Sequence, residues 1–84
     1  MEERTLTSRQ IDNRDAVRYA SGEDTPYTGW VIDYYDSGQL KLKEYYLDGK
    51  VHGEWLRYHP DGMLEYRKIF EHGTMKDDLT GSSM

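Results

Sequence analysis

The amino-acid sequence predicts a small all-β protein, a meander of tandem antiparallel β-hairpins in a single twisted sheet. Three observations predict this class: an internal repeat of 24 residues, turn residues at fixed places within it, and many aromatic residues. The 84 residues include 8 Tyr, 2 Trp and 1 Phe, so that 13% of the chain is aromatic. Aromatic and β-branched side chains favour a pleated, half-buried sheet over a helical core.

The repeat is found by sliding the chain against itself, and its glycines carry most of the signal. Residues of the same kind recur 24 positions apart along the second half of the chain. The matched pairs are Gly29 with Gly53, Ile32 with Leu56, Tyr34 with Tyr58, Gly38 with Gly62, Leu40 with Leu64, Lys43 with Arg67, Tyr46 with Phe70, and Gly49 with Gly73.

Each repeat is expected to be a strand, a turn, a return strand and a second turn. In the second repeat, residues 53–58 form an aromatic-rich strand, residues 59–62 (His-Pro-Asp-Gly) a turn, and residues 63–70 the return strand. The equivalent turn of the first repeat is Asp-Ser-Gly at 36–38, and Asp-Gly-Lys at 48–50 ends its return strand.

Three segments follow from this pattern. Residues 29–77 hold the two repeats, and residues 78–84 are expected to form a flexible polar tail. Residues 1–28 are an N-terminal segment in which 5–11 can be a strand, 12–15 a turn and 16–19 a return strand. Because the repeat glycines are absent there, the sequence leaves open whether this segment is a third, degenerate hairpin.

Alternation along the strands predicts which side chains form the core, because neighbouring residues point to opposite faces of a sheet. The expected core face consists of Ile32, Tyr34, Leu40, Leu42, Tyr46, Leu56, Tyr58, Leu64, Tyr66 and Phe70. Trp30 has the parity of Ile32, whereas Trp55 lies opposite Leu56. The two tryptophans are therefore expected on different faces.

The second repeat, with Gly-x-Trp-x-x-Tyr at 53–58, a turn glycine, a leucine, an aromatic residue and Gly73, resembles the MORN repeat and especially its bacterial variant. Residues 14–19 (Arg-Asp-Ala-Val-Arg-Tyr) with 26–29 (Pro-Tyr-Thr-Gly) are similar to the lead-in of the bacterial MORN-variant antitoxin family. The resemblance covers residues 14–77. The chain departs from the family in Ala16, where a turn glycine is common, in its few repeats and in its acidic balance.

The resemblance implies an elongated, twisted sheet of hairpins used for contacts with proteins. For the bacterial variant it implies binding and blocking of a toxin, and for some eukaryotic relatives attachment to membranes or phospholipids. The acidic balance of this chain puts lipid binding in doubt.

Composition limits the function classes. With 11 basic and 16 acidic residues the chain has a net charge of −5, which argues against a groove for nucleic-acid phosphates or anionic lipid. A chain of 84 residues is too short for a deep enzyme cleft, and without cysteine it has neither disulfides nor thiolate metal sites. The polar N-terminus has no secretory signal, so a cytoplasmic location is expected.

Chemistry-bearing residues do not form a recognisable constellation. His52, His59 and His72 occupy three different repeat positions and are not expected to converge into a metal or acid–base site. The carboxylates that a glycosidase-like pair would need have a simpler role on solvated faces and in turns: Asp33, Asp36, Glu44 and Asp48. No glycine-rich phosphate loop is present. We therefore expect no enzyme activity, no cofactor and no metal.

Large, stiff and half-polar aromatic residues are the usual anchors of protein interfaces. The candidate interface residues are Trp30, Tyr35, Tyr45 and Trp55, and core packing is the alternative role for each.

The leading hypothesis is a protein-binding module that uses one aromatic face, with a toxin as one possible partner. A self-associating scaffold is the alternative, because two hairpins leave an open edge and bury little surface, and we expect a homodimer or larger assembly. Stacking of single-stranded nucleic acid on aromatic residues beside Lys41, Lys43, Arg67 and Lys68 is a third, less favoured reading.

Overall fold

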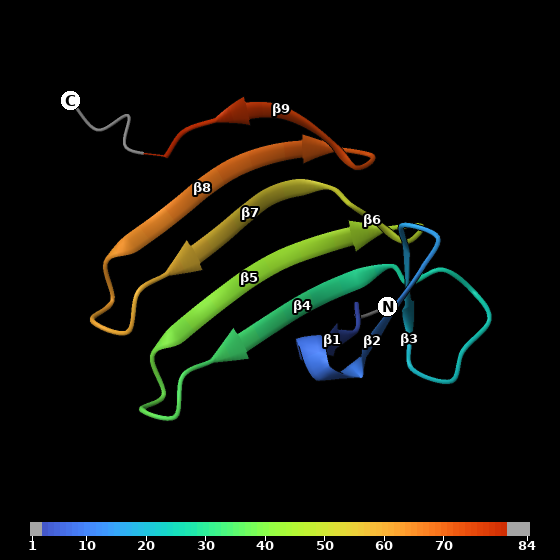
Figure 1. Cartoon of the computed structure of the whole chain (residues 1–84), viewed down its shortest axis with the longest axis horizontal. Coiled ribbons are helices and arrows are strands. Elements are labelled where there is room, and N and C mark those ends of the chain that lie inside the picture. Colours follow the sequence, from blue (N-terminus) through green and yellow to red (C-terminus); the bar gives the residue numbers. More distant parts are fainter. Residues whose placement is uncertain (1–2, 81–84) are drawn as a thin grey trace.

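The computed structural model describes residues 3–80 and has the expected all-β architecture (Figure 1). Strands β4, β5, β7, β8 and β9 form an antiparallel meander, β1 pairs in parallel with β4, and β6 pairs with β5. The elements are β1 (Thr5–Leu6), the short helix η1 (Ser8–Gln10), β2 (Ile11–Arg14), β3 (Val17–Ala20), β4 (Gly29–Tyr34), β5 (Leu40–Leu47), β6 (Lys50–Val51), β7 (Gly53–Tyr58), β8 (Leu64–Glu71) and β9 (Thr74–Asp78).

The two repeats have the same backbone plan. Gly29 pairs with Tyr46 in the β4–β5 hairpin, as Gly53 pairs with Phe70 in the β7–β8 hairpin, and each hairpin has a register shift at its turn end. The loops also match: the Tyr35 N–H donates to the Gln39 carbonyl at 2.8 Å, and His59 N–H donates to the Met63 carbonyl at 2.8 Å. The 24-residue period therefore sets the register of the sheet.

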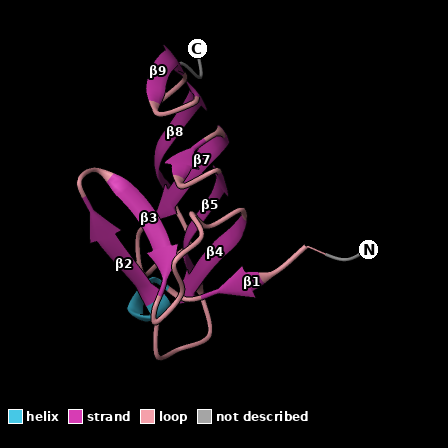
Figure 2. Ribbon diagram, turned by 90° about the vertical axis from the view of Figure 1, so that its right-hand side faces the viewer, coloured by secondary structure: helices cyan, strands magenta, loops and turns pink. Residues whose placement is uncertain are grey.

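The N-terminal hairpin, β2 and β3, exists but lies outside the meander. It forms a separate two-stranded sheet and crosses over one face of β4 and β5 (Figure 2). Its turn places Asp15 and Ala16 at φ 53° and 66°, as the two central residues of a type I′ turn require. The segment is thus a hairpin, but it packs on the first repeat and does not extend the sheet of the repeats.

Register assigns each side chain to one of two faces, because directly paired residues point the same way. We call the face under the N-terminal hairpin the inner face and the opposite face the outer face. In the first repeat the inner face carries Val31, Asp33, Leu42, Glu44 and Tyr46, and in the second Trp55, Arg57, Tyr66, Lys68 and Phe70. The outer face carries Trp30, Ile32, Lys43, Tyr45, Glu54, Leu56, Arg67 and Ile69.

The expected core face was therefore wrong in part. Ile32 pairs with Lys43 and not with Leu42, so Ile32 and Leu42 lie on opposite faces. A shift of one residue exchanges the two faces, and the bulge beside Tyr34 introduces such a shift. Tyr34 and Leu64 are 62% and 44% exposed. The expectation that Trp30 and Trp55 lie on different faces is confirmed.

The core lies where the N-terminal hairpin packs on the first repeat. Its buried members are Ala20, Tyr27, Val31 and Tyr46, and Leu6, Ile11 and Val51 pack against them. Val31, which was absent from the expected core, is only 1% exposed. Apolar burial is thus concentrated on the first repeat.

The segment expected to be a flexible tail begins inside β9. Asp78 pairs with Lys68, and Leu79 N–H donates to the Arg67 carbonyl at 2.7 Å. Thr80 accepts a 2.8 Å hydrogen bond from the Arg67 N–H. Residues 78–80 therefore continue along β8, and the rest of that segment, 81–84, lies outside the described residues. Within residues 3–80, no helix has the length and apolar character needed to cross a membrane.

Candidate functional site

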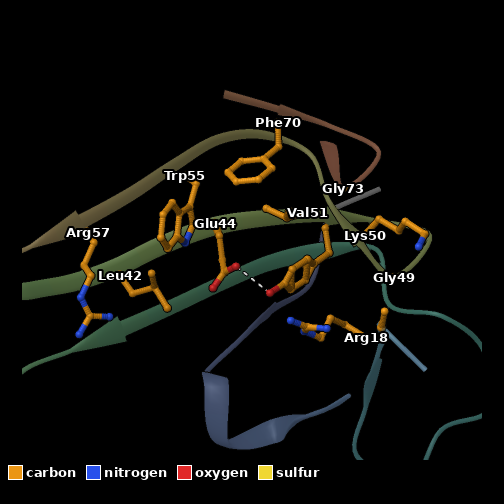
Figure 3. A pocket seen from close by; sticks show the side chains of 12 residues that line it. Arg18, Leu42, Glu44, Gly49, Lys50, Val51, Trp55, Arg57, Phe70 and Gly73 are labelled. Atoms are coloured by element: carbon orange, nitrogen blue, oxygen red, sulfur yellow. Dashed lines mark hydrogen bonds between the residues drawn. The ribbon is translucent and has the colours of Figure 1, made fainter. Parts of the chain in front are cut away.

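A groove of about 520 Å³ lies on the inner face, between the N-terminal hairpin and the second repeat (Figure 3). Arg18 and Ala16 border it from the hairpin. Its apolar lining consists of Leu42, Val51, Trp55 and Phe70, and its ionisable side chains, besides Arg18, are Glu44, Lys50 and Arg57. The groove therefore combines apolar side chains with charged and polar ones.

Glu44 and Tyr46 form the polar centre of the groove. The Tyr46 hydroxyl donates a 2.6 Å hydrogen bond to Glu44. Figure 3 marks this bond by the dashed line that ends at the Glu44 carboxylate. Burial raises the pKa of Glu44, although the hydrogen bond and the charge of Arg18 act in the opposite direction. Burial and the bond to Glu44 also raise the pKa of the Tyr46 hydroxyl. This network satisfies two polar groups beneath the hairpin.

A raised carboxyl pKa in a cavity is also what a general acid needs. Among the described residues that line the groove, however, Glu44 is the only carboxylate, and Ser, Thr, Cys and His are not represented. Among these residues the groove thus lacks the second carboxylate of a glycosidase-like pair and the Ser, Thr, Cys or His side chain of the common nucleophile–base arrangements.

An aromatic cluster continues from the groove over the second repeat. The rings of Trp55 and Tyr66 stack with centroids 5.7 Å apart, and Phe70 meets Trp55 edge-on at 6.0 Å. The Lys68 ammonium lies 5.4 Å from the Trp55 centroid and 4.9 Å from that of Tyr66. Beyond Phe70, its partner Met75 on β9 is 50% exposed.

The second repeat therefore presents aromatic and basic groups where the first has aliphatic and acidic ones. At equivalent positions Trp55 replaces Val31 and Tyr66 replaces Leu42. Both carboxylates of the first repeat are replaced by cations, Asp33 by Arg57 and Glu44 by Lys68. We call the set Trp55, Arg57, Tyr66, Lys68 and Phe70 the open inner face, because all five are partly exposed and the N-terminal hairpin packs on the first repeat.

The four candidate interface residues do not share a face. Trp30 and Tyr45 meet on the outer face, with centroids 5.0 Å apart, and the Lys43 ammonium lies 5.0 Å from Trp30. Tyr45 also donates to a Glu3 carboxylate oxygen. Tyr35 lies in the β4–β5 loop, and its hydroxyl donates to the Tyr58 carbonyl at 2.8 Å. Only Trp55 belongs to the open inner face.

Sequence reasoning placed Tyr66 and Phe70 in the core and left Arg57 unassigned, although Lys68 was considered for nucleic acid. The sequence signal that identifies the open inner face is a reversal of charge between the repeats. Asp33 and Glu44 of the first repeat are replaced in the second by Arg57 and Lys68, respectively. That exchange becomes meaningful only once the register shows that all four positions lie on one face.

Two of the three histidines converge, contrary to expectation. The rings of His52 and His72 lie 4.8 Å apart, and the His72 N–H donates to Nδ1 of His52 at 3.2 Å. Strand β6 and the turn before β9 bring them together, although their repeat positions differ. Within residues 3–80, no group of three or more His, Cys, Asp or Glu side chains is placed to hold a metal ion.

The carboxylates outside the groove have local roles. Asp33 accepts a 2.9 Å hydrogen bond from the Ser8 N–H, which ties η1 to β4. Asp48 occupies a turn position with φ 51°, and Asp36 is exposed in the β4–β5 loop.

In comparisons with known proteins, no family model, no curated protein and no solved structure matches this chain.

Proposed function

We propose that this protein is a non-enzymatic binding module that holds a protein partner on its open inner face. The observation that carries the proposal is the contrast between the repeats: the hairpin buries the inner face of the first, while the equivalent aromatic cluster of the second is partly exposed. Three aromatic rings and a thioether lie side by side on β7, β8 and β9, partly or largely exposed, and contiguous apolar patches of this kind mark interaction sites when they are large. Trp, Tyr and Arg, which gather here, are the residues most enriched in interface hot spots.

Toxin neutralisation is the specific form of this function that the resemblance to MORN-variant antitoxins suggests. The support for it comes from the sequence pattern at residues 14–29 and 53–73. An antitoxin acts by covering a partner, which requires an accessible surface and no catalytic residues. The open inner face meets that requirement.

Self-association is the second candidate. Met75 and Phe70 supply an apolar margin on which a second copy can pack face to face. Pairing of two copies through the exposed edge strand of the sheet, β9, is disfavoured. Strand β9 carries Lys76, Asp77 and Asp78, and charged residues protect an edge strand from pairing with another strand. Sedimentation velocity at high micromolar concentration tests this candidate, and a folded monomer would contradict it.

A pull-down with matched variants tests the leading proposal. The bait is the intact protein, and the variants are Trp55→Ala with Phe70→Ala on the inner face, and Trp30→Ala with Tyr45→Ala on the outer face, each first checked for folding by circular dichroism. We expect a stoichiometric protein to be retained by the intact chain and the outer-face variant but lost from the inner-face variant. Retention by all three, or loss only from the outer-face variant, contradicts the proposal.

A further inference from the structure

We propose that the open inner face binds an acidic segment of the partner, an extended stretch in which an apolar side chain is flanked by carboxylates. This inference rests on the proposed function and specifies the chemistry of the partner. It follows from how the N-terminal segment of the same chain packs on the first repeat.

The N-terminal segment brings an N–H donor to one carboxylate of the first repeat and a positive charge near the other. The Ser8 N–H donates to Asp33, and Arg18 of β3 lies where its charge acts on Glu44 (Figure 3). The apolar side chains around these groups are buried beneath the same segment, with Val31 1% and Tyr46 7% exposed. The N-terminal segment is therefore complementary to the first repeat in both charge and apolar surface.

At the same backbone positions the second repeat has the opposite charge. Arg57 replaces Asp33 and Lys68 replaces Glu44. A segment that packs on the second repeat must therefore supply hydrogen-bond acceptors at the positions where the N-terminal segment supplies an N–H donor or a positive charge to the first repeat. The hairpin of a second copy would bring Arg18 toward Lys68, and like charges facing each other are unfavourable. An acidic partner segment has the required complementarity.

Neither cation is fully neutralised by the chain itself. Arg57 pairs with Glu65 at 3.3 Å but keeps 36% of its side chain exposed. Among the described ion pairs within 4.0 Å none includes Lys68, whose ammonium lies over the aromatic rings, although Asp78 of β9 pairs with Lys68 on the same face and the two charges attract each other at longer range. On the groove margin, Lys50 is exposed and is likewise outside the described ion pairs. Carboxylates of a partner can therefore reach basic groups on both sides of the aromatic cluster.

The groove supplies the site for the apolar side chain. Its volume of about 520 Å³ exceeds that of any single side chain, and Trp55 and Phe70 form one wall of it. The cluster then continues across the strands from Phe70 on β8 to Met75 on β9. An extended segment that places one aromatic or long aliphatic side chain in the groove brings its neighbours close to Arg57, Lys68 or Lys50.

Single-stranded nucleic acid is the competing ligand for a surface of aromatic and basic residues. Bases bind by stacking on free ring faces. Here Trp55 and Tyr66 stack on each other at an interplanar angle of 12°, and Lys68 lies over both rings. A base would have to displace these contacts. The observations favour the acidic peptide.

The test uses the full chain with Trp30→Phe, so that Trp55 is the only tryptophan and its fluorescence reports the groove. The probes are three N-acetylated, C-amidated pentapeptides, Glu-Glu-Phe-Glu-Glu, Lys-Lys-Phe-Lys-Lys and Glu-Glu-Ala-Glu-Glu, together with dodecathymidylate, all at low salt. We expect the first peptide to change the Trp55 emission saturably and to bind at least about tenfold more tightly than the other two peptides. Lys68→Glu should remove that preference, whereas Lys43→Glu on the outer face should preserve it.

Equal affinity for the acidic and basic Phe peptides, preference for the basic one, or tighter binding of dodecathymidylate would each overturn the inference. If the Trp55 emission responds to none of the probes while the pull-down still loses its partner on Trp55→Ala with Phe70→Ala, the acidic-segment inference fails and the proposed function stands. If the pull-down also shows no dependence on these two residues, both fail.

Discussion

The first and second repeats share the same backbone plan but differ in the side chains of their inner faces. Their registers, bulges and loop hydrogen bonds coincide at a spacing of 24 residues, yet Val31 and Tyr46 are buried while Trp55 and Phe70 are partly exposed. The difference arises from the side chains on one face and from the hairpin that packs on one repeat alone. It teaches that turn and glycine positions determine this sheet, whereas the inner-face residues determine which surface each repeat buries or leaves exposed.

The largest expected effect comes from truncating the equivalent aromatic residues. Tyr46→Ala should lower the free energy of unfolding by about 3–5 kcal/mol, since it empties the core and leaves Glu44 without its donor. Phe70→Ala, at the same repeat position, should lower it by only about 1 kcal/mol, because Phe70 is partly exposed. Urea unfolding of both variants measures the two losses in the free energy of unfolding. Equal losses would contradict the comparison between the repeats.

A second pair compares the glycines that begin β4 and β7. An alanine Cβ at Gly29 would lie 2.7 Å from the Tyr27 hydroxyl oxygen and 2.8 Å from the Arg4 carbonyl oxygen, whereas no atom lies within 4 Å of one at Gly53. Both positions have positive φ, so both variants are strained, but Gly29→Ala adds the overlap. We expect Gly29→Ala to be less stable than Gly53→Ala by about 1–3 kcal/mol, measured by thermal unfolding. The reverse order would contradict the packing on the first repeat.

The turn of the covering hairpin offers a stabilising change. Ala16 adopts φ 66°, where the equivalent turn positions of the repeats have Gly49 and Gly73. Ala16→Gly should raise the free energy of unfolding by about 0.5–1 kcal/mol, since glycine adopts this conformation without the steric penalty. Ala20→Gly, in the strand and buried, is the matched control and should destabilise the protein. A loss of stability in Ala16→Gly would show that the turn differs from a type I′ turn.

The smallest expected effect is a dependence on pH that belongs to the first repeat. Because burial raises the folded-state pKa of Glu44, its contribution to stability is present at acidic pH and is lost as the pH rises through that raised value. The free energy of unfolding of the natural chain should therefore fall relative to Glu44→Gln as the pH rises from below the ordinary glutamate pKa to above the raised one. Tyr46→Phe should steepen the fall, as it removes the hydrogen bond that opposes the shift. Parallel pH profiles for the natural chain and Glu44→Gln would contradict this account.

Much of the fold follows from the sequence, because the residues that encode it are local. Turn glycines at a constant spacing gave the hairpins, their order and the separation of Trp30 from Trp55. The sequence did not predict which face is buried, since a bulge beside Tyr34 changes the parity of the following strand. It also left unresolved that the N-terminal hairpin covers the repeats, because no local pattern encodes the packing of one hairpin on another.

The candidate site was predicted less well than the fold. Trp55 was selected for its chemistry, and the structure places it on the open inner face. Trp30, Tyr45 and Tyr35 were selected for the same reason, but they pack elsewhere. Aromatic character alone does not distinguish the faces, whereas the reversal of charge at Arg57 and Lys68 does once the register is known.

Site-specific photo-crosslinking tests the central claim most directly. We would replace Tyr66 on the open inner face, or Tyr45 on the outer face as the matched variant, with p-benzoylphenylalanine and irradiate cells that express the protein. The account predicts a covalent adduct with a single partner protein through position 66 and none through position 45. An adduct through position 45 alone, or equal adducts through both, would contradict it.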